Sequence, residues 1–306
     1  MAWGFPIAMY LFLAGMGAGA FITAVAAEIY NKVAYRPLIR AGLILSGILV
    51  GLGMPFLIAD LGAGRTQPWR LIWLISNPTS PMTWGVWVLT PFIPLGLVLG
   101  WLEVDFLNPP WRVVRWFRAW ALRWRTRLLQ VGALLAIAIS IYTGLLLGVV
   151  HGVPLWNTSI LPMLFFVSAL STGLAACVVL SQVTAVKMEH DGVHLAKSYF
   201  YLNQIHSALI VIETVFIFCW LFIVANGSVT AALSVDLLLT GQYSLYFWIG
   251  IVFFGVVDPL IIYIYEIVLH RPLKPYWVLI SDSSVILGGL VLRYLVIAAA
   301  VPIVLT

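Results

Sequence analysis

Residues 126–150 read TRLLQVGALLAIAISIYTGLLLGVV and carry no charged side chain after Arg127. A transmembrane helix needs about 20 consecutive, predominantly apolar residues, and this stretch is long enough. The rest of the sequence has the same character, since 63% of its 306 residues are hydrophobic and only 9% are charged. A soluble domain carries about 25% charged residues. The sequence therefore predicts an all-α polytopic membrane protein and excludes the soluble fold classes.

Eight apolar stretches of this kind occur, at residues 4–28, 39–60, 84–106, 126–150, 160–186, 203–226, 244–268 and 276–305. Their apolar residues are continuous, whereas the strands of a membrane β-barrel alternate. The first run lacks a basic n-region, so we interpret it as a retained span and not as a signal peptide.

Spans one and five resemble each other. Leu11-Phe12 with Gly15 and Gly19 matches Leu164-Phe165 with Ser168 and Thr172, at an offset of half the sequence. Small residues four apart let helices approach closely. We therefore expect eight transmembrane helices arranged as two four-helix bundles, residues 1–150 and 151–306.

The basic residues predict the orientation. Thirteen of the 16 Lys and Arg residues lie in or beside the loops after spans one, three, five and seven, and the opposite loops hold only Arg65 and Arg70. Since Lys and Arg collect in cytoplasmic loops, both termini are predicted to lie outside. In a bacterium this places the protein in the inner (cytoplasmic) membrane, with periplasmic termini.

Two loops have more character than connectors. Residues 108–125 interleave arginines with four tryptophans, a pattern typical of an amphipathic helix on the anionic lipid of the cytoplasmic leaflet. The outer loop 61–83 is long and half apolar, and it carries Arg65 and Arg70. A loop of this length in a compact domain is usually functional, and we expect its WRLIWLI core to form a short interfacial helix.

Metal cofactors are tested by counting their ligands. Only His206 lies inside a span, so the paired histidines of a membrane haem are missing. Two cysteines, Cys177 and Cys219, are too few for a disulfide scaffold or for an iron–sulfur cluster, which needs about four thiolates. We expect no metal, haem or iron–sulfur cluster in this protein, and nothing in its composition indicates a nucleic-acid partner.

Ionisable residues inside spans are functional candidates. In the second half, His206 and Glu213 are seven residues apart and share a helix face, while Asp258, Asp282 and Arg293 lie deeper in spans seven and eight. These five residues have two interpretations, a structural polar cluster or a proton path, and both stay open. Near the cytoplasmic rim, ion pairing with the basic loops is expected for Glu28, Glu103, Asp105 and Glu266.

The first half is aromatic at its outer ends. Tyr142 and Tyr10 lie about two turns below the outer ends of spans four and one, among Trp3, Pro6 and Trp84. Two phenols at matching depth offer O–H groups to a quinone carbonyl, with Arg65 or Arg70 nearby. These residues predict a quinone pocket near the outer face.

Several segments resemble the NrfD/PsrC family, the membrane subunits of polysulfide reductase-like and nitrite reductase-like complexes. They are WGFPIAMYLFLAG (residues 3–15), NPTSPMTWG (77–85), YTG (142–144), PLWNT (154–158), Gly288-Gly289 and Leu292-Arg293-Tyr294. They are distributed over nearly the whole sequence, and the predicted topology agrees with the resemblance.

This resemblance implies a quinone site, for menaquinone or ubiquinone, in the first bundle near the outer face. It also implies a peripheral, ferredoxin-like iron–sulfur subunit docked outside, followed by a molybdopterin-type or multihaem catalytic subunit. Tyr142 matches the tyrosine of span four in the family. Where some relatives carry Asn and His in span one, this protein has Ile7 and Tyr10, which makes Tyr10 the substitute candidate.

The leading hypothesis is therefore a quinone-binding subunit that exchanges electrons between the membrane quinone pool and an iron–sulfur partner. One alternative is a secondary transporter or proton-conducting subunit without a redox role, since charged residues lie in spans six to eight. Another is a pure membrane anchor for a peripheral enzyme.

Overall fold

The computed structural model describes residues 3–60, 75–104, 111–185, 192–269 and 274–303. Within these ranges the regular structure is entirely helical, and eight helices are long and apolar enough to cross a membrane. The elements are α1 (Phe5–Asn31), α2 (Arg36–Asp60), α4 (Pro81–Leu102), α5 (Arg112–Arg123), α6 (Arg125–Gly148), α7 (Ile160–Ala185), α8 (Gly192–Ala225), α9 (Val229–Leu239), η3 (Tyr246–Val257), α10 (Asp258–Leu269) and α11 (Pro275–Ala298). The prediction of eight helical spans is confirmed.

The last span is shorter than predicted, because α11 ends at Ala298 and residues 299–303 leave the helix. Pro302 disfavours a helical conformation in the residue before it. The tail is instead held by two backbone donors: Ile303 N donates to Gly152 O (2.9 Å), and Val301 N donates to Ser234 Oγ (3.2 Å).

Two further helical features were not predicted. α9 is an 11-residue helix between spans six and seven, and the Ser228 side chain caps it by accepting a hydrogen bond from Ala231 N. Span seven begins as a π-helix, η3, and becomes α-helical at Asp258. Pro259 follows at this point, and because it has no N–H, the α-helical hydrogen-bond ladder cannot run through it unbroken.

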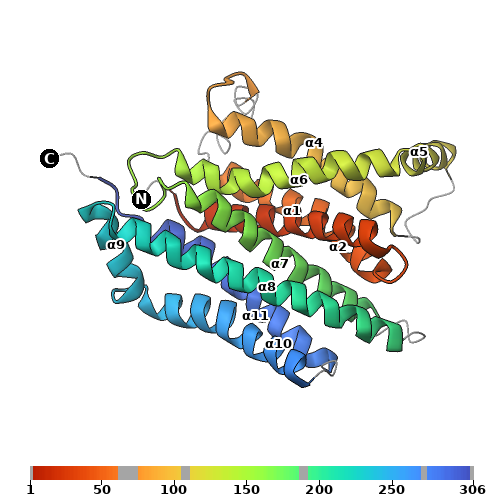
Figure 1. Ribbon diagram of the computed structural model, residues 1–306. Helices are drawn as coiled ribbons and strands as arrows, with labels where there is room; N and C mark the ends of the chain where they lie inside the picture. The colour runs from red at the N-terminus through yellow and green to blue at the C-terminus, as the bar shows by residue number, and fades with distance from the viewer. Residues whose placement is uncertain (1–2, 61–74, 105–110, 186–191, 270–273, 304–306) are drawn as a thin grey trace.

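Spans one and five meet in the middle of the helix array, where α1 packs against α2, α6, α7 and α11 (Figure 1). A Cβ atom on Gly19 would overlap the backbone of Ala169, and one on Gly173 would overlap the backbone of Gly19 and Ala20. Small residues therefore bring the two backbones into direct contact, as expected for such a pattern. The division of the sequence at residue 150 into two bundles stays a prediction.

Both ends of the protein reach the same connection, the one between α6 and α7. The Trp3 ring stacks on Trp156 with centroids 5.2 Å apart, and the tail bonds to Gly152. We call this end of the array the outer end and the opposite one the inner end. The side of the membrane that each end faces stays a prediction.

A charged clamp joins three helices at the inner end. Arg125 at the start of α6 pairs with Glu28 of α1 and, at 2.9 Å, with Glu103 just after α4; Lys32 also pairs with Glu28, at 3.3 Å. The predicted ion pairing of Glu28 and Glu103 at the rim is confirmed. Asp105 lies outside the described residues.

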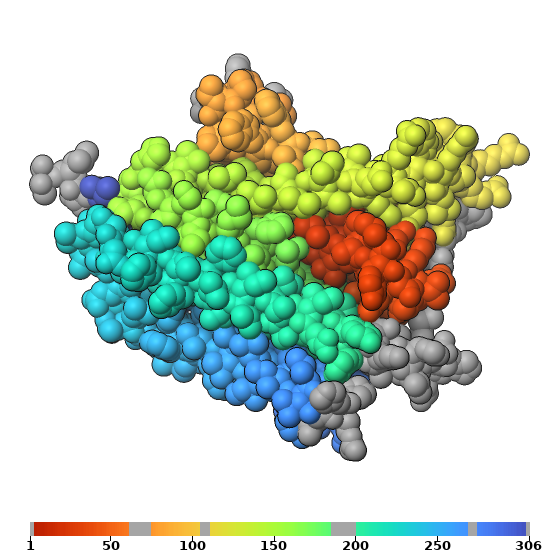
Figure 2. All heavy atoms as spheres, in the orientation of Figure 1, coloured from red at the N-terminus to blue at the C-terminus, as the bar shows by residue number. Residues whose placement is uncertain are grey.

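The amphipathic helix predicted in residues 108–125 is α5, which lies across the direction of the spans at the inner end (Figure 1) and projects from the body of the array (Figure 2). Phe117 stacks on Trp120, and Ala121 is buried. Trp111 and Trp116 are largely exposed (70% and 69%). This placement suits a helix that lies in the plane of a membrane surface.

Candidate functional site

The two predicted phenols are brought together near the outer end. Tyr10 is fully buried, its ring approaches Gly53 of α2, and its hydroxyl has no hydrogen-bond partner in the described part of the protein. Tyr142 of α6 is 8% exposed and lies against Gly85 of α4, where a Cβ atom would overlap the phenol. The two phenols are close enough to interact electrostatically. Four helices thus meet around one pair of tyrosines, which we call the phenol pair.

The phenol pair lies at one depth. Tyr10 is five residues inward from the start of α1, Tyr142 is six residues from the end of α6, and Gly85 is four residues into α4. With a rise of 1.5 Å per residue, these positions are roughly 6–9 Å below the outer helix ends. A lipid-soluble ligand bound there remains near the outer surface.

The other predicted pocket residues occupy different places. Trp3 stacks on Trp156, whose Nε1–H donates to Val296 O (2.6 Å) in α11. Pro6 lies in the first turn of α1. Trp84 is 51% exposed and donates from Nε1 to Pro78 O (2.7 Å), so its ring faces outward. Arg65 and Arg70 lie outside the described residues.

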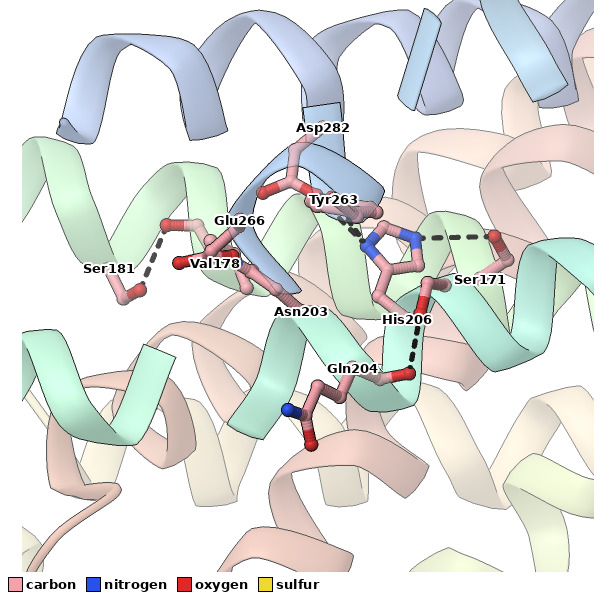
Figure 3. A network of polar contacts seen from close by, with 10 residues as sticks. Ser171, Val178, Ser181, Asn203, Gln204, His206, Tyr263, Glu266 and Asp282 are labelled. Atoms are coloured by element: carbon pink, nitrogen blue, oxygen red, sulfur yellow. Dashed lines mark hydrogen bonds and ion pairs between the residues drawn. The ribbon is translucent and has the colours of Figure 1, made fainter. Parts of the chain in front are cut away.

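The predicted proton-path residues of the second half form the centre of a second site. The His206 ring of α8 lies between three partners (Figure 3). Its Nδ1 is 2.9 Å from the Tyr263 hydroxyl and 3.0 Å from Asp282 Oδ1, while its Nε2 is 3.3 Å from the Ser171 hydroxyl. Tyr263 donates its own O–H to Asp282 Oδ1 (2.7 Å). All four side chains are buried.

Toward the outer end, Ser168 and Ser171 of α7 connect this group to Glu213 and Arg293. Glu213 forms hydrogen bonds with both serine hydroxyls and interacts electrostatically with Arg293. Arg293 donates from Nη1 to Ser168 Oγ and to Gly289 O, both at 3.0 Å. Its guanidinium also lies between the Phe12 and Phe165 rings, 5.8 and 5.4 Å from their centroids.

Toward the inner end, Asn203 donates from Nδ2 to Glu266 Oε2 (2.6 Å), and both residues are buried. Glu266 therefore lies in the interior, although rim pairing was expected for it. We call the whole set the polar network: Ser168, Ser171, Asn203, His206, Glu213, Tyr263, Glu266, Asp282 and Arg293.

Asp258 stands apart from the polar network. One of its carboxylate oxygens is buried without a hydrogen-bond partner, and no bond among the described residues joins it to the network. The structure thus connects four of the five predicted proton-path residues: His206, Glu213, Asp282 and Arg293.

Within the described ranges, no group of three or more His, Cys, Asp or Glu side chains has the arrangement of a metal site. Cys177 is a buried free thiol whose Sγ–H donates weakly to Ala20 O (3.7 Å), and Cys219 is also free.

A family model described as "Polysulphide reductase, NrfD" matches residues 1–304. The protein belongs to this family. The resemblance inferred from its short segments is therefore confirmed.

Three relatives of this NrfD-family protein match it over most of its length. The polysulfide reductase subunit of Wolinella succinogenes that bears the letter C is 30% identical over 98% of this sequence and 94% of its own. The NrfD homolog of Haemophilus influenzae is 28% identical over 85% of this sequence and 83% of its own, and Protein NrfD of Escherichia coli is 26% identical over 98% and 95%.

Sequence reasoning missed several members of the polar network in this NrfD-family protein. Tyr263, Asn203, Ser168 and Ser171 are ordinary residues of apolar spans, and hydropathy does not single them out. A weak signal existed in α8, where Asn203 and His206 are three residues apart and so share a face.

Proposed function

We propose that this NrfD-family protein is a quinone-binding membrane subunit of a respiratory oxidoreductase. It exchanges electrons between the quinone pool of a bacterial inner membrane, as menaquinone or ubiquinone, and a peripheral iron–sulfur subunit. The observation that carries this proposal is the phenol pair: the Tyr10 hydroxyl is fully buried, has no acceptor among the described residues and lies beside Tyr142 near the outer end.

A buried hydroxyl without a partner is unfavourable by about 1–3 kcal/mol, so a ligand that supplies the missing acceptor is stabilised at this position. A quinone carbonyl is such an acceptor, and its apolar ring and tail suit a site reached from the bilayer. The glycines at positions 53 and 85 add no side chains to the walls beside the two phenols. The residues present therefore fit a quinone.

When bound, a quinone supplies two-electron, two-proton redox chemistry. In this site Tyr10 and Tyr142 donate O–H bonds to its carbonyl oxygens and fix the orientation of its ring. The buried apolar residues of α1 and α6 around the two phenols keep bulk water away from the ring. The position near the outer end holds the ring within reach of a partner that docks there.

Partners follow from the family. One relative is by name a lettered component of a polysulfide reductase, which indicates an enzyme with several subunits. For this protein we propose a ferredoxin-like iron–sulfur subunit on the outer side, in contact with loop 61–83 through Arg65 and Arg70. That subunit passes electrons to, or receives them from, a molybdopterin-type or multihaem catalytic subunit. We further propose that the outer end is periplasmic; a reporter fused after Thr306 and active only in the cytoplasm would contradict this orientation.

Quinone binding is tested directly with the full-length protein in nanodiscs, titrated with one naphthoquinone and one benzoquinone analogue. We expect Tyr10→Phe and Tyr142→Phe each to raise Kd by roughly 2- to 13-fold, because a hydrogen bond is worth about 0.5–1.5 kcal/mol.

Tyr276→Phe is the matched control, since Tyr276 is a half-exposed phenol at the inner end of α11. Its Kd should equal that of the wild type. Unchanged affinity in both Tyr10→Phe and Tyr142→Phe would place the quinone elsewhere.

A further inference from the structure

The polar network extends through much of the helix array. Along α8 it reaches from Asn203 to Glu213, ten residues or about 15 Å. Its links are hydrogen bonds or short polar contacts between buried side chains of α7, α8, α10 and α11. Burying this many polar groups in an apolar protein is unfavourable unless they serve one another or a function.

His206 joins the two ends of this network. The single proton of the Tyr263 hydroxyl is donated to Asp282, so Nδ1–H of His206 must be the donor toward Tyr263 and Asp282. In the neutral ring, Nε2 then accepts from the Ser171 hydroxyl. The two ring nitrogens therefore face opposite directions along the network, which is the arrangement that lets a histidine take a proton on one side and release it on the other.

Polar atoms without protein partners concentrate in the same half of the molecule. Nine buried side-chain N or O atoms lack a partner among the described residues, and six of them belong to spans five, seven and eight. They are Gln182 Oε1, Asp258 Oδ2, Ser281 Oγ, Asp282 Oδ2, Arg293 Nε and Arg293 Nη2. Internal water is the usual partner of such atoms, and a hydrogen-bonded water can also carry a proton between them.

The two ends of the polar network differ. Glu266 and the buried Gln182 each lie three residues from the inner ends of their helices, about 5 Å away. Outward of Glu213 the residues of α8 that face the interior are Ile217, Trp220 and Val224, all buried. Trp220 Nε1 donates to Leu155 O (3.2 Å), so even its polar atom is occupied. The outer end of the network is closed by an apolar layer.

The outer end of the network touches α1. A Cβ atom on Gly15 would be 3.0 Å from Arg293 Nη2, so the guanidinium lies against the α1 backbone. Gly15 is five residues inward of Tyr10, or about 8 Å along the helix. The helix that carries one of the two phenols therefore also borders the end of the polar network.

We propose that the polar network is a one-sided proton relay, which is open toward the inner end of the array and stops at Glu213 and Arg293 beside α1. A proton on Asp282 passes to Tyr263, whose own proton passes to Nδ1 of His206. Nε2 releases a proton to Ser171, whose own proton passes to Glu213. One O–H bond breaks at Asp282, one forms at Glu213, and tautomer exchange resets the ring.

The charged and titratable groups around this path come from each neighbouring helix. The His206 ring faces Asp282 of α11, Tyr263 and Glu266 of α10, and Glu213 of its own helix. From α7, the Cys177 thiol lies near Asp282. Arg293 supplies the positive charge opposite Glu213.

The relay is tested by infrared spectroscopy on the full-length protein in sealed vesicles, with orientation assigned by protease access to a tag after Thr306. The signal is the C=O band of a protonated carboxylic acid, and the Glu213→Gln variant identifies the part that belongs to Glu213. We expect this band to follow the pH on the inner-end side and to ignore the pH on the outer-end side. His206→Gln should abolish the response of Glu213.

Asp258→Asn is the matched control, because Asp258 is a carboxylate of the same half that no bond among the described residues joins to the polar network. It should leave the Glu213 response unchanged. A Glu213 band that follows the outer pH would overturn the one-sided path. A band that follows neither side, or that still responds in His206→Gln, would overturn the relay.

The delivery of these protons to a quinone rests on the proposed function and is measured separately. In vesicles that hold the whole complex, Glu213→Gln should lower quinone-coupled turnover about tenfold while analogue Kd stays at the wild-type value. If the wild-type complex shows no quinone turnover but the infrared response is present, the quinone function fails and the relay stands.

Discussion

The phenol pair and the polar network are both buried and polar, yet they use their hydrogen-bonding groups differently. Tyr10 and Tyr142 are isolated donors between apolar helices, and the Tyr10 hydroxyl meets no acceptor among the described residues. In the polar network, donors and acceptors from four helices follow one another over about 15 Å. Isolated donors suit recognition of a ligand from outside, whereas linked donors and acceptors suit the movement of protons within the protein.

α1 is the helix that both regions share. One of its faces carries Tyr10, and another receives Arg293 at Gly15. The contact of α1 with α7 at Gly19 holds the two halves at this distance. The difference between the regions can therefore be probed by changing the shared contact, then each region alone, and finally the inner rim.

The largest effect is expected at the shared contact. In Gly19→Leu the new side chain would overlap the Ala169 backbone, which cannot move without separating α1 from α7. Overpacking against backbone is strongly destabilising. We expect little or no folded protein in the membrane fraction, measured by detergent extraction and size-exclusion chromatography.

Gly51→Leu is the control for this change, because Gly51 is also a span residue but the nearest atom to its Cβ position is 3.9 Å away, on Ile93. It should extract and elute as the wild type does. A monodisperse Gly19→Leu protein would show that the α1–α7 contact is looser than described.

The next effect concerns the phenol pair alone. Tyr142→Phe keeps the ring that packs against Gly85 and removes only the hydroxyl, so folding should be unaffected. If the hydrogen bond strengthens in the transition state, quinone-coupled turnover of the complex falls about tenfold or more. Activity with an artificial donor supplied to the peripheral subunits should stay at the wild-type level.

Tyr10→Phe should behave in the same way, and the two losses should not add fully if both hydroxyls bind the same ligand. Wild-type quinone kinetics in both variants would move the site away from the phenol pair. Equal loss with both donors would instead indicate that assembly is damaged.

A smaller effect is expected on docking. Arg65 and Arg70 are the only basic residues in the predicted outer loops. Reversing both to Glu should weaken the hold on the peripheral subunit several-fold, and the loss should be largest at low ionic strength. Co-purification at increasing salt measures it. A double variant that keeps its partner as firmly as the wild type at every salt concentration would assign docking to other residues.

The parts that could be predicted from the sequence are those that depend on one-dimensional order. The apolar runs defined the spans, and counting residues from their ends placed Tyr10 and Tyr142 at matching depth. What could not be predicted depends on the rotation of helices about their axes and on short-range geometry. Ser168, Asn203 and Tyr263 join the polar network only because their faces turn toward His206 and its neighbours. Likewise, α9 is too short to be recognised by hydropathy, and the π-helical turn before Asp258 reflects a local backbone adjustment.

The smallest effect is expected at the inner rim, where Arg125 bridges Glu28 and Glu103 without belonging to either polar region. The three side chains are 14%, 16% and 19% exposed, so each pair is screened less than a surface pair but more than a buried one. Arg125→Met should lower stability by about 1–2 kcal/mol, seen as a fall of a few degrees in Tm, because two carboxylates then lose their shared partner. Arg127→Met is the control, since Arg127 lies over the Trp124 ring, 4.8 Å from its centroid, and has no such pair of carboxylates among the described residues. If the loss comes from unpaired charge, adding Glu28→Gln and Glu103→Gln to Arg125→Met should restore most of the Tm. A triple variant less stable than Arg125→Met would mean that the guanidinium contributes through packing of its stem, and quinone kinetics in every one of these variants should match the wild type.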